Sequence, residues 1–423
     1  MHTSHLPCPL SNAVRPEIAL LLWCGRPQTA AHMLRIEALL REEIDWTYLV
    51  RTALAHGMSP LLARALGQVS SGIPDELQET LQDHLRNNRA RNEQLAFVLT
   101  DLLEGLGHHG VAAIPFKGPV LSAVAYGDPS LRRAGDLDIL VREDDLSAVC
   151  HTLTESGFRE LTERTTGRPM TAAEDRAHRR YQCEYAFVRE SDQVVVEPHW
   201  AIAPSALAVA LDYPGLWARA KPVPMLGREI LSLAHEDLLV LLSVHGSKHE
   251  WSQLRWICDL AGLIERHPRI DLESALARAC DQGCGRMLLV GLGLTGRVLG
   301  MELPPSIRRD LEGDRTALAL VDHVAHRLFQ AGPPTDTHGR VTRFLLRVRE
   351  RSGDRLRYVV RTVTTPGIEH MRLVSLPPWL HGLYVPIKLL CDYLLSPLWR
   401  VTKHARQLGA RRRAPDGGAS PFR

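Results

Sequence analysis

The segment FKGPVLSAVAYGDPSLRRAGDLDILV, residues 116–141, predicts the part of the chain that folds around a β-sheet. It ends in DLDILV, an apolar run typical of a buried strand, yet Asp136 and Asp138 interrupt that run. Side chains two residues apart on a strand point to the same face, with Cα atoms about 6.6 Å apart. We therefore expect the two carboxylates to project together, while Leu137 and Ile139 pack on the other face.

The flanking sequence alternates between strand and helix patterns. VAAIPF (111–116) is a short β-type run, and GPVLSAVAYG (118–127) is a short helix with a proline in its first turn. A second helix is expected over 144–156, and YQCEYAFVR (181–189) with QVVVEPHW (193–200) is typical of a β-hairpin. Strand, helix, strand, helix and hairpin together predict a small unit with a mixed sheet.

Helical periodicity dominates on both sides of this unit. Apolar residues recur at helical spacing before residue 107 and again from Ala234 onward. We predict an α+β fold, in which a small mixed-sheet core is flanked by N- and C-terminal helical regions. The predicted parts are an N-terminal helical region (1–107), the α/β core (108–225), a helical domain packed on the core (226–330) and a C-terminal helical and basic region (331–423).

Composition restricts the function classes. A chain of 423 residues with 45% hydrophobic side chains can form a large core, and a formal charge of +3 gives no global field for binding nucleic acid. The aromatic content of 5% also argues against nucleic acid as a partner. Eight cysteines are scattered without a CxxC pair, and the N-terminus lacks the basic region of a signal peptide. We therefore expect reduced thiols and a cytoplasmic location.

The C-terminal region carries two further predictions. Its longest apolar stretch, residues 376–399, is interrupted by Lys388 and Asp392, so we do not expect it to span a bilayer. Residues 376–413 combine apolar and basic side chains, which suits either docking onto the body of the protein or resting on a membrane surface. The Gly/Pro/Arg-rich tail, residues 411–423, is predicted to be disordered.

The paired carboxylates suit a divalent cation. Mg²⁺ takes oxygen ligands from one or two carboxylates and from substrate phosphates, and two-metal sites hold their ions about 3.5–4 Å apart. Glu197 supplies a third carboxylate inside the apolar run QVVVEPHW. Upstream, Lys117 and Gly118 stand at a strand-to-helix turn, where free backbone N–H groups favour an anion. The alternatives are a chance Asp-x-Asp and a turn that only starts a helix.

Together, the turn, the paired carboxylates and the later glutamate resemble the polymerase-β-type nucleotidyltransferase superfamily. That superfamily has a turn of small residues, then Asp-x-Asp or Asp-x-Glu, then an acidic residue on a neighbouring strand. Here Lys117-Gly118-Pro119 stands where Gly-Ser is usual, so a serine hydroxyl and one N–H are missing from the usual phosphate contacts. With VVVEPHW and LLVLLSVHGSKHEWSQLRWICDLAGLI, residues 40–265 more closely resemble a poorly characterised bacterial nucleotidyltransferase family found beside exopolysaccharide and peptide natural-product genes.

This resemblance implies a role for each matching residue. Lys117 and Gly118 would contact the triphosphate of an NTP. Asp136, Asp138 and Glu197 would form the acidic triad that holds Mg²⁺, with two ions expected and Mn²⁺ as the alternative metal.

Two further residues keep two interpretations each. Arg132 would contact phosphate or steady its loop, and the alternative is a salt bridge to the REDD segment, residues 142–145. His199 shares the face of Glu197, so it would orient that carboxylate or touch the acceptor. The alternative is a structural histidine.

A second histidine cluster follows on a predicted helix. His245 and His249 are one helical turn apart, a spacing that also occurs in zinc sites, but Gly246 stands where a zincin carries its glutamate. We expect Trp256 in the core and the polar face, His245, Lys248 and His249, along one wall of the nucleotide or acceptor cleft. Structural zinc and a plain interdomain contact are the alternatives.

The sequence thus predicts a metal-dependent enzyme that moves a nucleoside monophosphate from an NTP to a hydroxyl or phosphate of an acceptor and releases pyrophosphate. The acceptor classes are a small molecule, a sugar, a peptide or a protein. The alternative is a catalytically silent nucleotide-binding or partner-binding module of the same fold, which the unusual turn at 117–119 favours.

Overall fold

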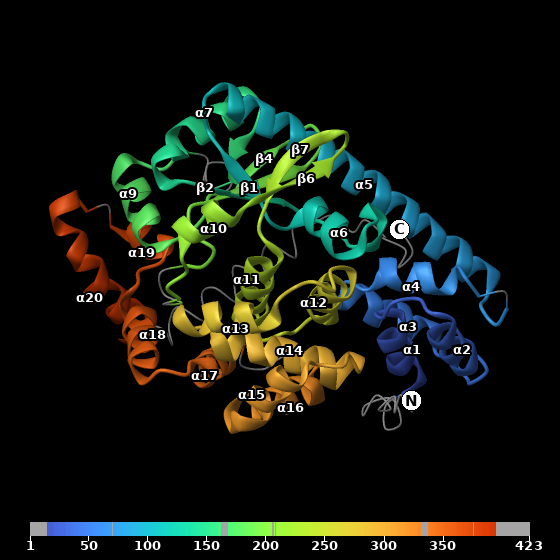
Figure 1. Ribbon diagram of the computed structural model, residues 1–423. Helices are drawn as coiled ribbons and strands as arrows, with labels where there is room; N and C mark the ends of the chain where they lie inside the picture. The colour runs from blue at the N-terminus through green and yellow to red at the C-terminus, as the bar shows by residue number, and fades with distance from the viewer. Residues whose placement is uncertain are drawn as a thin grey trace.

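The central strands expected from the sequence lie in one mixed sheet that is surrounded by helices (Figure 1). The computed structural model describes residues 15–69, 71–161, 168–204, 207, 209–330, 337–374 and 376–394. Within these residues the protein has an α+β fold, as predicted, with helices both before and after the sheet in the chain.

The sheet has five strands, and its second and third strands are parallel to each other. The strand order is β1 (Ala113–Pro115), β2 (Leu137–Val141), β5 (Val194–His199), β4 (Phe187–Arg189) and β3 (Arg159–Glu160). The other neighbouring strands are antiparallel. The parallel register sets Asp138 opposite Glu197 and Leu140 opposite His199. The predicted mixed sheet and hairpin are therefore present.

Most of the described connections between the strands contain helical segments, and one of these helices was not predicted. They are α6 (Gly118–Tyr126), η1 (Pro129–Leu131), η2 (Glu143–Asp145), α7 (Leu146–Glu155) and α9 (Ala172–Tyr181). Residue 181 ends α9, so the first strand of the predicted hairpin is shorter than expected. Helix α9 is rich in charged residues and has few apolar ones; its Thr171 and Glu174 form a capping box that stabilises the first turn.

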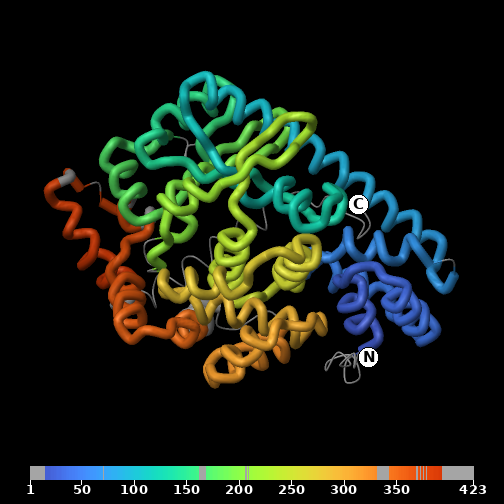
Figure 2. The backbone as a smooth tube through the Cα atoms, in the orientation of Figure 1, coloured from blue at the N-terminus to red at the C-terminus, as the bar shows by residue number. Residues whose placement is uncertain are grey.

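The described N-terminal residues form five helices, of which α5 reaches the elements around the sheet. These are α1 (Pro16–Cys24), α2 (Ala30–Leu39), α3 (Trp46–Ala55), α4 (Ser59–Leu66) and α5 (Asp75–His108). Helix α5 is long and runs from the other N-terminal helices to the sheet (Figure 2). Its Asn88 and Asn92 donate hydrogen bonds of 2.6 Å to the carbonyls of Ser130 and Arg132. Helix α5 therefore holds the loop that enters β2.

Among the residues that the structure describes after the sheet, the regular elements are helices and one hairpin. Helix α10 (Tyr213–Arg219) and the hairpin β6 (Lys221–Met225) and β7 (Arg228–Ser232) come first. The helices that follow are α11 (His235–Lys248), α12 (Leu254–Arg266), α13 (Leu272–Asp281), α14 (Gly285–Leu299), α15 (Pro305–Gly313) and α16 (Arg315–Arg327). Helix α14 is almost entirely buried and packs against α11, α12, α13 and α16. The hairpin was not predicted, and the proposed boundary at 225 falls within it; the four-part division stays a prediction.

The last described segment follows these helices in the chain, and its first helix packs against α11 and α16. It contains α17 (Thr337–Val348), α18 (Ser352–Thr364), α19 (Ile368–Leu373), η4 (Pro378–Leu383), α20 (Tyr384–Leu389) and one π-helical turn, η5 (Leu390–Leu394). Helix α19 packs beside α9. None of the helices in the described ranges is long and apolar enough to cross a membrane. Residues 395–413 of the proposed membrane-surface segment and the predicted disordered tail, 411–423, lie outside the described residues.

Candidate functional site

The two central strands bring the predicted carboxylates together. Because β2 and β5 are parallel with Asp138 opposite Glu197, these side chains emerge on the same face of the sheet. Asp136 comes one residue before β2 begins, and the charges of Asp138 and Glu197 act on its carboxylate. Leu137 and Ile139 are fully buried, as the strand period predicts.

Asp138 is the centre of a buried polar cluster. Its side chain is 1% exposed, and its Oδ1 accepts a 2.7 Å bond from Lys117 Nζ and lies 3.1 Å from His199 Nε2. His199 Nε2 also lies 3.6 Å from Glu197 Oε2. Asp138 Oδ2 is buried and has no hydrogen-bond partner among the described residues. A buried carboxylate oxygen without a donor is costly unless something else satisfies it.

The charges of this cluster are unbalanced toward the negative. Burial alone would raise the pKa of Asp138, but Lys117 and His199 lower it far below its ordinary value. Burial and the charges of Asp138 and Glu197 raise the pKa of Asp136 from 3.8 to about 6. The protein therefore keeps Asp138 ionised and makes a second negative charge beside it unfavourable, which a bound cation would relieve.

Gly118 sets the turn between β1 and α6 against the entry to β2. Its φ is +58°, a left-handed conformation that favours glycine. A Cβ at this position would lie 2.8 Å from the backbone oxygen of Asp136. The close approach that requires glycine is thus to the chain itself. Lys117, the residue before α6, points its amine to Asp138 from this turn.

Arg132 anchors the loop before β2 to helix α12. Its Nε lies 3.1 Å from both carboxylate oxygens of Asp259, and Tyr126 OH donates to the same carboxylate at 2.9 Å. Arg132 is 8% and Asp259 1% exposed. Of the two roles expected for Arg132, this geometry fits loop support. Its ion pair is with Asp259 rather than with the proposed partner segment, residues 142–145.

The second histidine cluster lies at the C-terminal end of α11, which approaches the carboxylates; His245 is on the helix and His249 directly follows it. The rings of His245 and His249 are 4.8 Å apart, and Trp256, buried as predicted, contacts both. Burial and the charge of Lys117 lower the pKa of His245 well below its ordinary value, and Asp138 opposes that shift. The charge of Lys248 lowers the pKa of the Cys183 thiol, although burial raises that pKa overall. His245, Lys248 and His249 therefore lie near the cluster around Asp138.

The alternative of a structural zinc site on α11 gains no support. Among the described residues, the groups of histidine, cysteine and acidic side chains close enough to share a metal include neither His245 nor His249. Gly246 has a packing reason instead, because a Cβ there would lie 2.6 Å from the ring of Trp251, which is fully buried.

Two residues at the site were missed from the sequence. Cys183 and Glu184 precede β4, and Glu184 Oε2 lies 3.1 Å from His199 Nδ1. Both residues lie in the predicted hairpin strand 181–189, and the observed register, which pairs Arg189 with Val194, sets Glu184 opposite His199. The observed bridge joins those two residues.

The chemistry of the donors fits a hard divalent cation. Asp138 Oδ2, Glu197 and Asp136 offer carboxylate oxygens on one face of the sheet, which is the ligand type that Mg²⁺ requires. Asp138, Glu197 and His199 have potential ligand atoms within 4.8 Å of one another. Glu197 is 25% exposed, so solvent reaches the cluster from its side.

One comparison with known proteins found a related family. A family model described as an uncharacterised nucleotidyltransferase matches residues 42–300. The matched range extends from just before α3 to the end of α14 and includes the whole sheet and helices α11 and α12. No curated protein and no solved structure matches the chain.

Proposed function

We propose that this chain, which belongs to the uncharacterised nucleotidyltransferase family, transfers a nucleoside monophosphate from an NTP to a hydroxyl or phosphate of an acceptor and releases pyrophosphate. The observation that carries this proposal is Asp138, a buried, strongly ionised carboxylate whose Oδ2 has no donor among the described residues. We extend the proposal to a polymerase-β-type site that acts in the cytoplasm.

The metal-binding residues of the proposal are Asp136, Asp138 and Glu197. Mg²⁺ bound there would neutralise charge on the triphosphate and on the attacking oxygen. Asp138 keeps Oδ2 for a cation because Lys117 and His199 occupy Oδ1. A cation would also favour the ionised form of Asp136, since it would offset the repulsion by Asp138 and Glu197 that raises the pKa of Asp136.

The phosphate-binding part of the proposal rests on the turn before α6. Lys117 Nζ is 2.7 Å from Asp138, so its charge lies within reach of phosphate oxygens bound at that carboxylate. Gly118 contributes by holding the turn against Asp136. Arg132 acts as a positioning residue through its ion pair with Asp259.

The transfer step follows from the exposure of the carboxylates. The acceptor oxygen attacks the α-phosphorus in line, a new P–O bond forms, and the bond to the pyrophosphate oxygen breaks. Glu197, whose side chain is 25% exposed, would take the acceptor proton, whereas the side chain of Asp138 is only 1% exposed. His245 and Lys248 on α11, and His249 directly after it, would line the path by which the nucleotide or the acceptor enters.

A catalytically silent nucleotide-binding module is the second candidate. It is favoured by the turn at 117–119, where Gly118 packs against a backbone oxygen and Pro119 has no N–H to offer a phosphate. In that case the acidic cluster would bind a metal and NTP without transfer.

A pyrophosphate-release screen separates the two candidates. The four NTPs with Mg²⁺ are tested against pools of sugars, sugar phosphates, peptides and the protein itself, with Asp138→Asn and the exposed-site control Asp322→Asn. We expect release by the wild type and by Asp322→Asn, and at least a thousand-fold less by Asp138→Asn. Metal-dependent NTP binding with no pyrophosphate from any pool would favour the silent module. Full release by Asp138→Asn would overturn the proposed site.

A further inference from the structure

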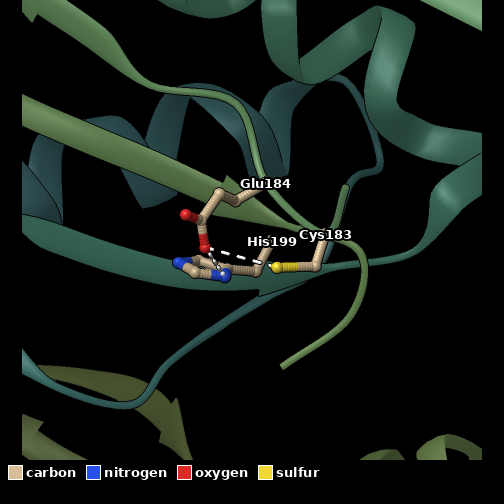
Figure 3. Close-up of side chains that lie close together, drawn as sticks. All are labelled: Cys183, Glu184 and His199. Carbon is tan, nitrogen blue, oxygen red and sulfur yellow. Dashed lines mark hydrogen bonds and ion pairs between the residues drawn. The ribbon is translucent and has the colours of Figure 1, made fainter. Parts of the chain in front are cut away.

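The side chains of Cys183, Glu184 and His199 lie close together (Figure 3), and this cluster shares His199 with the proposed catalytic carboxylates. Glu184 Oε2 is 3.1 Å from His199 Nδ1 and 3.5 Å from Cys183 Sγ, and all three ligand atoms lie within 4.8 Å of one another. Cys183 is 1% and His199 3% exposed. A thiol, a carboxylate and an imidazole thus converge on one point.

These separations suit a tetrahedral metal site. With Zn–N and Zn–O bonds of about 2.0 Å and a Zn–S bond of about 2.3 Å, tetrahedral ligands lie roughly 3.3 Å apart for N and O and roughly 3.5 Å apart for S and O. The observed 3.1 Å and 3.5 Å are within a few tenths of an ångström of these values. Sulfur and imidazole ligands favour zinc-like transition metals over Mg²⁺.

The polar atoms of His199 supply an independent observation. Nδ1 is buried and forms no hydrogen bond of proper geometry with a described residue, although Glu184 lies close to it. Nε2, on the other side of the ring, makes the contact with Asp138 Oδ1. A histidine that binds a metal through one nitrogen typically gives its other N–H to a carboxylate. His199 has this arrangement, with Asp138 as the carboxylate.

The backbone holds the three side chains in place before any ion binds. Glu184 pairs with His199 in an isolated bridge, and the N–H of Trp200 donates to the Cys183 carbonyl at 3.0 Å. The ring of Phe116 meets the His199 ring edge-on at 5.2 Å. Glu184 is 35% exposed, which leaves a path for an ion and room for a fourth ligand from solvent.

We propose that Cys183, Glu184 and His199 Nδ1 bind a zinc-like divalent ion, and that this ion orients His199 toward Asp138. The bond to Nδ1 places the ring proton on Nε2, where it is donated to Asp138 Oδ1 and leaves Oδ2 directed at the catalytic site. His199 therefore joins a soft site to the hard site formed by the carboxylates. The orienting role rests on the proposed function, whereas binding of the ion does not.

The test is metal content, measured without nucleotide. Full-length protein is loaded with Zn²⁺, dialysed against metal-free buffer and analysed by mass spectrometry, together with Cys183→Ser and the control Cys280→Ser. Cys280 is the exposed thiol among the described cysteines. We expect one zinc per chain in the wild type and in Cys280→Ser. Cys183→Ser should bind zinc at least ~10–100-fold more weakly, since even outer partners of metal ligands contribute that much.

Cobalt loading covers the case in which a variant folds poorly. Wild-type protein with Co²⁺ should show a thiolate-to-cobalt absorption band, and Cys280→Ser should retain it. No bound zinc after loading, or equal loss in both cysteine variants, would mean an adventitious ion only and would overturn the proposal. Zinc binding without pyrophosphate release would leave this site standing and count against the transfer reaction alone.

Discussion

The ion pair between Arg132 and Asp259 gives the most quantitative prediction for the loop that enters the site. Asp259→Asn keeps an acceptor for Tyr126 and changes little volume, but it removes the charge opposite Arg132. Both partners are nearly inaccessible to solvent, so the guanidinium would stay buried without a counter-charge. Breaking such a pair from one side costs about 3–5 kcal/mol. We expect Asp259→Asn to lower the free energy of unfolding by that amount.

Urea denaturation followed by circular dichroism measures this loss. The matched control is Asp322→Asn, which breaks the exposed pair between Arg297 and Asp322 and should cost about 1 kcal/mol or less. The double variant Arg132→Met/Asp259→Asn should recover part of the loss, because no unpaired charge remains. A loss below about 1 kcal/mol for Asp259→Asn, or no recovery in the double variant, would refute the account of Arg132 as an anchor.

Three further predictions concern pH, the turn and the phosphate contact. Burial lowers the pKa of His56 from 6.5 to about 4, so the unfolded chain takes up the proton at a higher pH than the folded protein does. The free energy of unfolding should therefore fall by about 2 kcal/mol from pH 7 to pH 5. Urea titrations at both pH values should show a smaller fall for His56→Asn. In the same assay Gly118→Ala should lower the free energy of unfolding by more than about 1 kcal/mol, because the φ of Gly118 is positive. The control Gly135→Ala should not, since a Cβ there meets open space. Equal losses in the two variants would contradict the requirement for glycine at 118. Lys117→Met should raise the KM for NTP at least about ten-fold, since hydrogen bonds to charged groups contribute about 1.5–3 kcal/mol; an unchanged KM would remove Lys117 from the phosphate site.

Local patterns were enough to predict the central strands and their polar residues. The two-residue period of β2 gives Asp138 a defined face because Leu137 and Ile139 must be buried on the other. The same period in β5 puts Glu197 and His199 on one face. The pairing of Glu184 with His199 depends on the exact hairpin register, which sets Arg189 opposite Val194 and which the predicted strands alone did not fix.

Long-range pairing could not be predicted from these patterns. Asp259 lies far along the chain from Arg132, and no periodicity links a loop arginine to a buried acid on α12. The parallel register of β2 and β5 depends on the whole connection between the two strands. Gly118 was expected to approach a phosphate, while the structure shows the backbone of Asp136 beside it. Such contacts depend on how the elements pack in three dimensions.

The central claim, that Asp136, Asp138 and Glu197 hold a metal with its nucleotide, is tested most directly without an acceptor. Electron paramagnetic resonance would follow Mn²⁺ binding in the presence of an NTP analogue with an uncleavable α–β bridge. Asp138→Asn and Glu197→Gln are compared with the control Asp322→Asn; Glu197, being partly exposed, gives a variant with little folding cost. The account predicts tight binding by the wild type and the control and at least ten-fold weaker binding by both site variants. Equal affinity in all four proteins would contradict it.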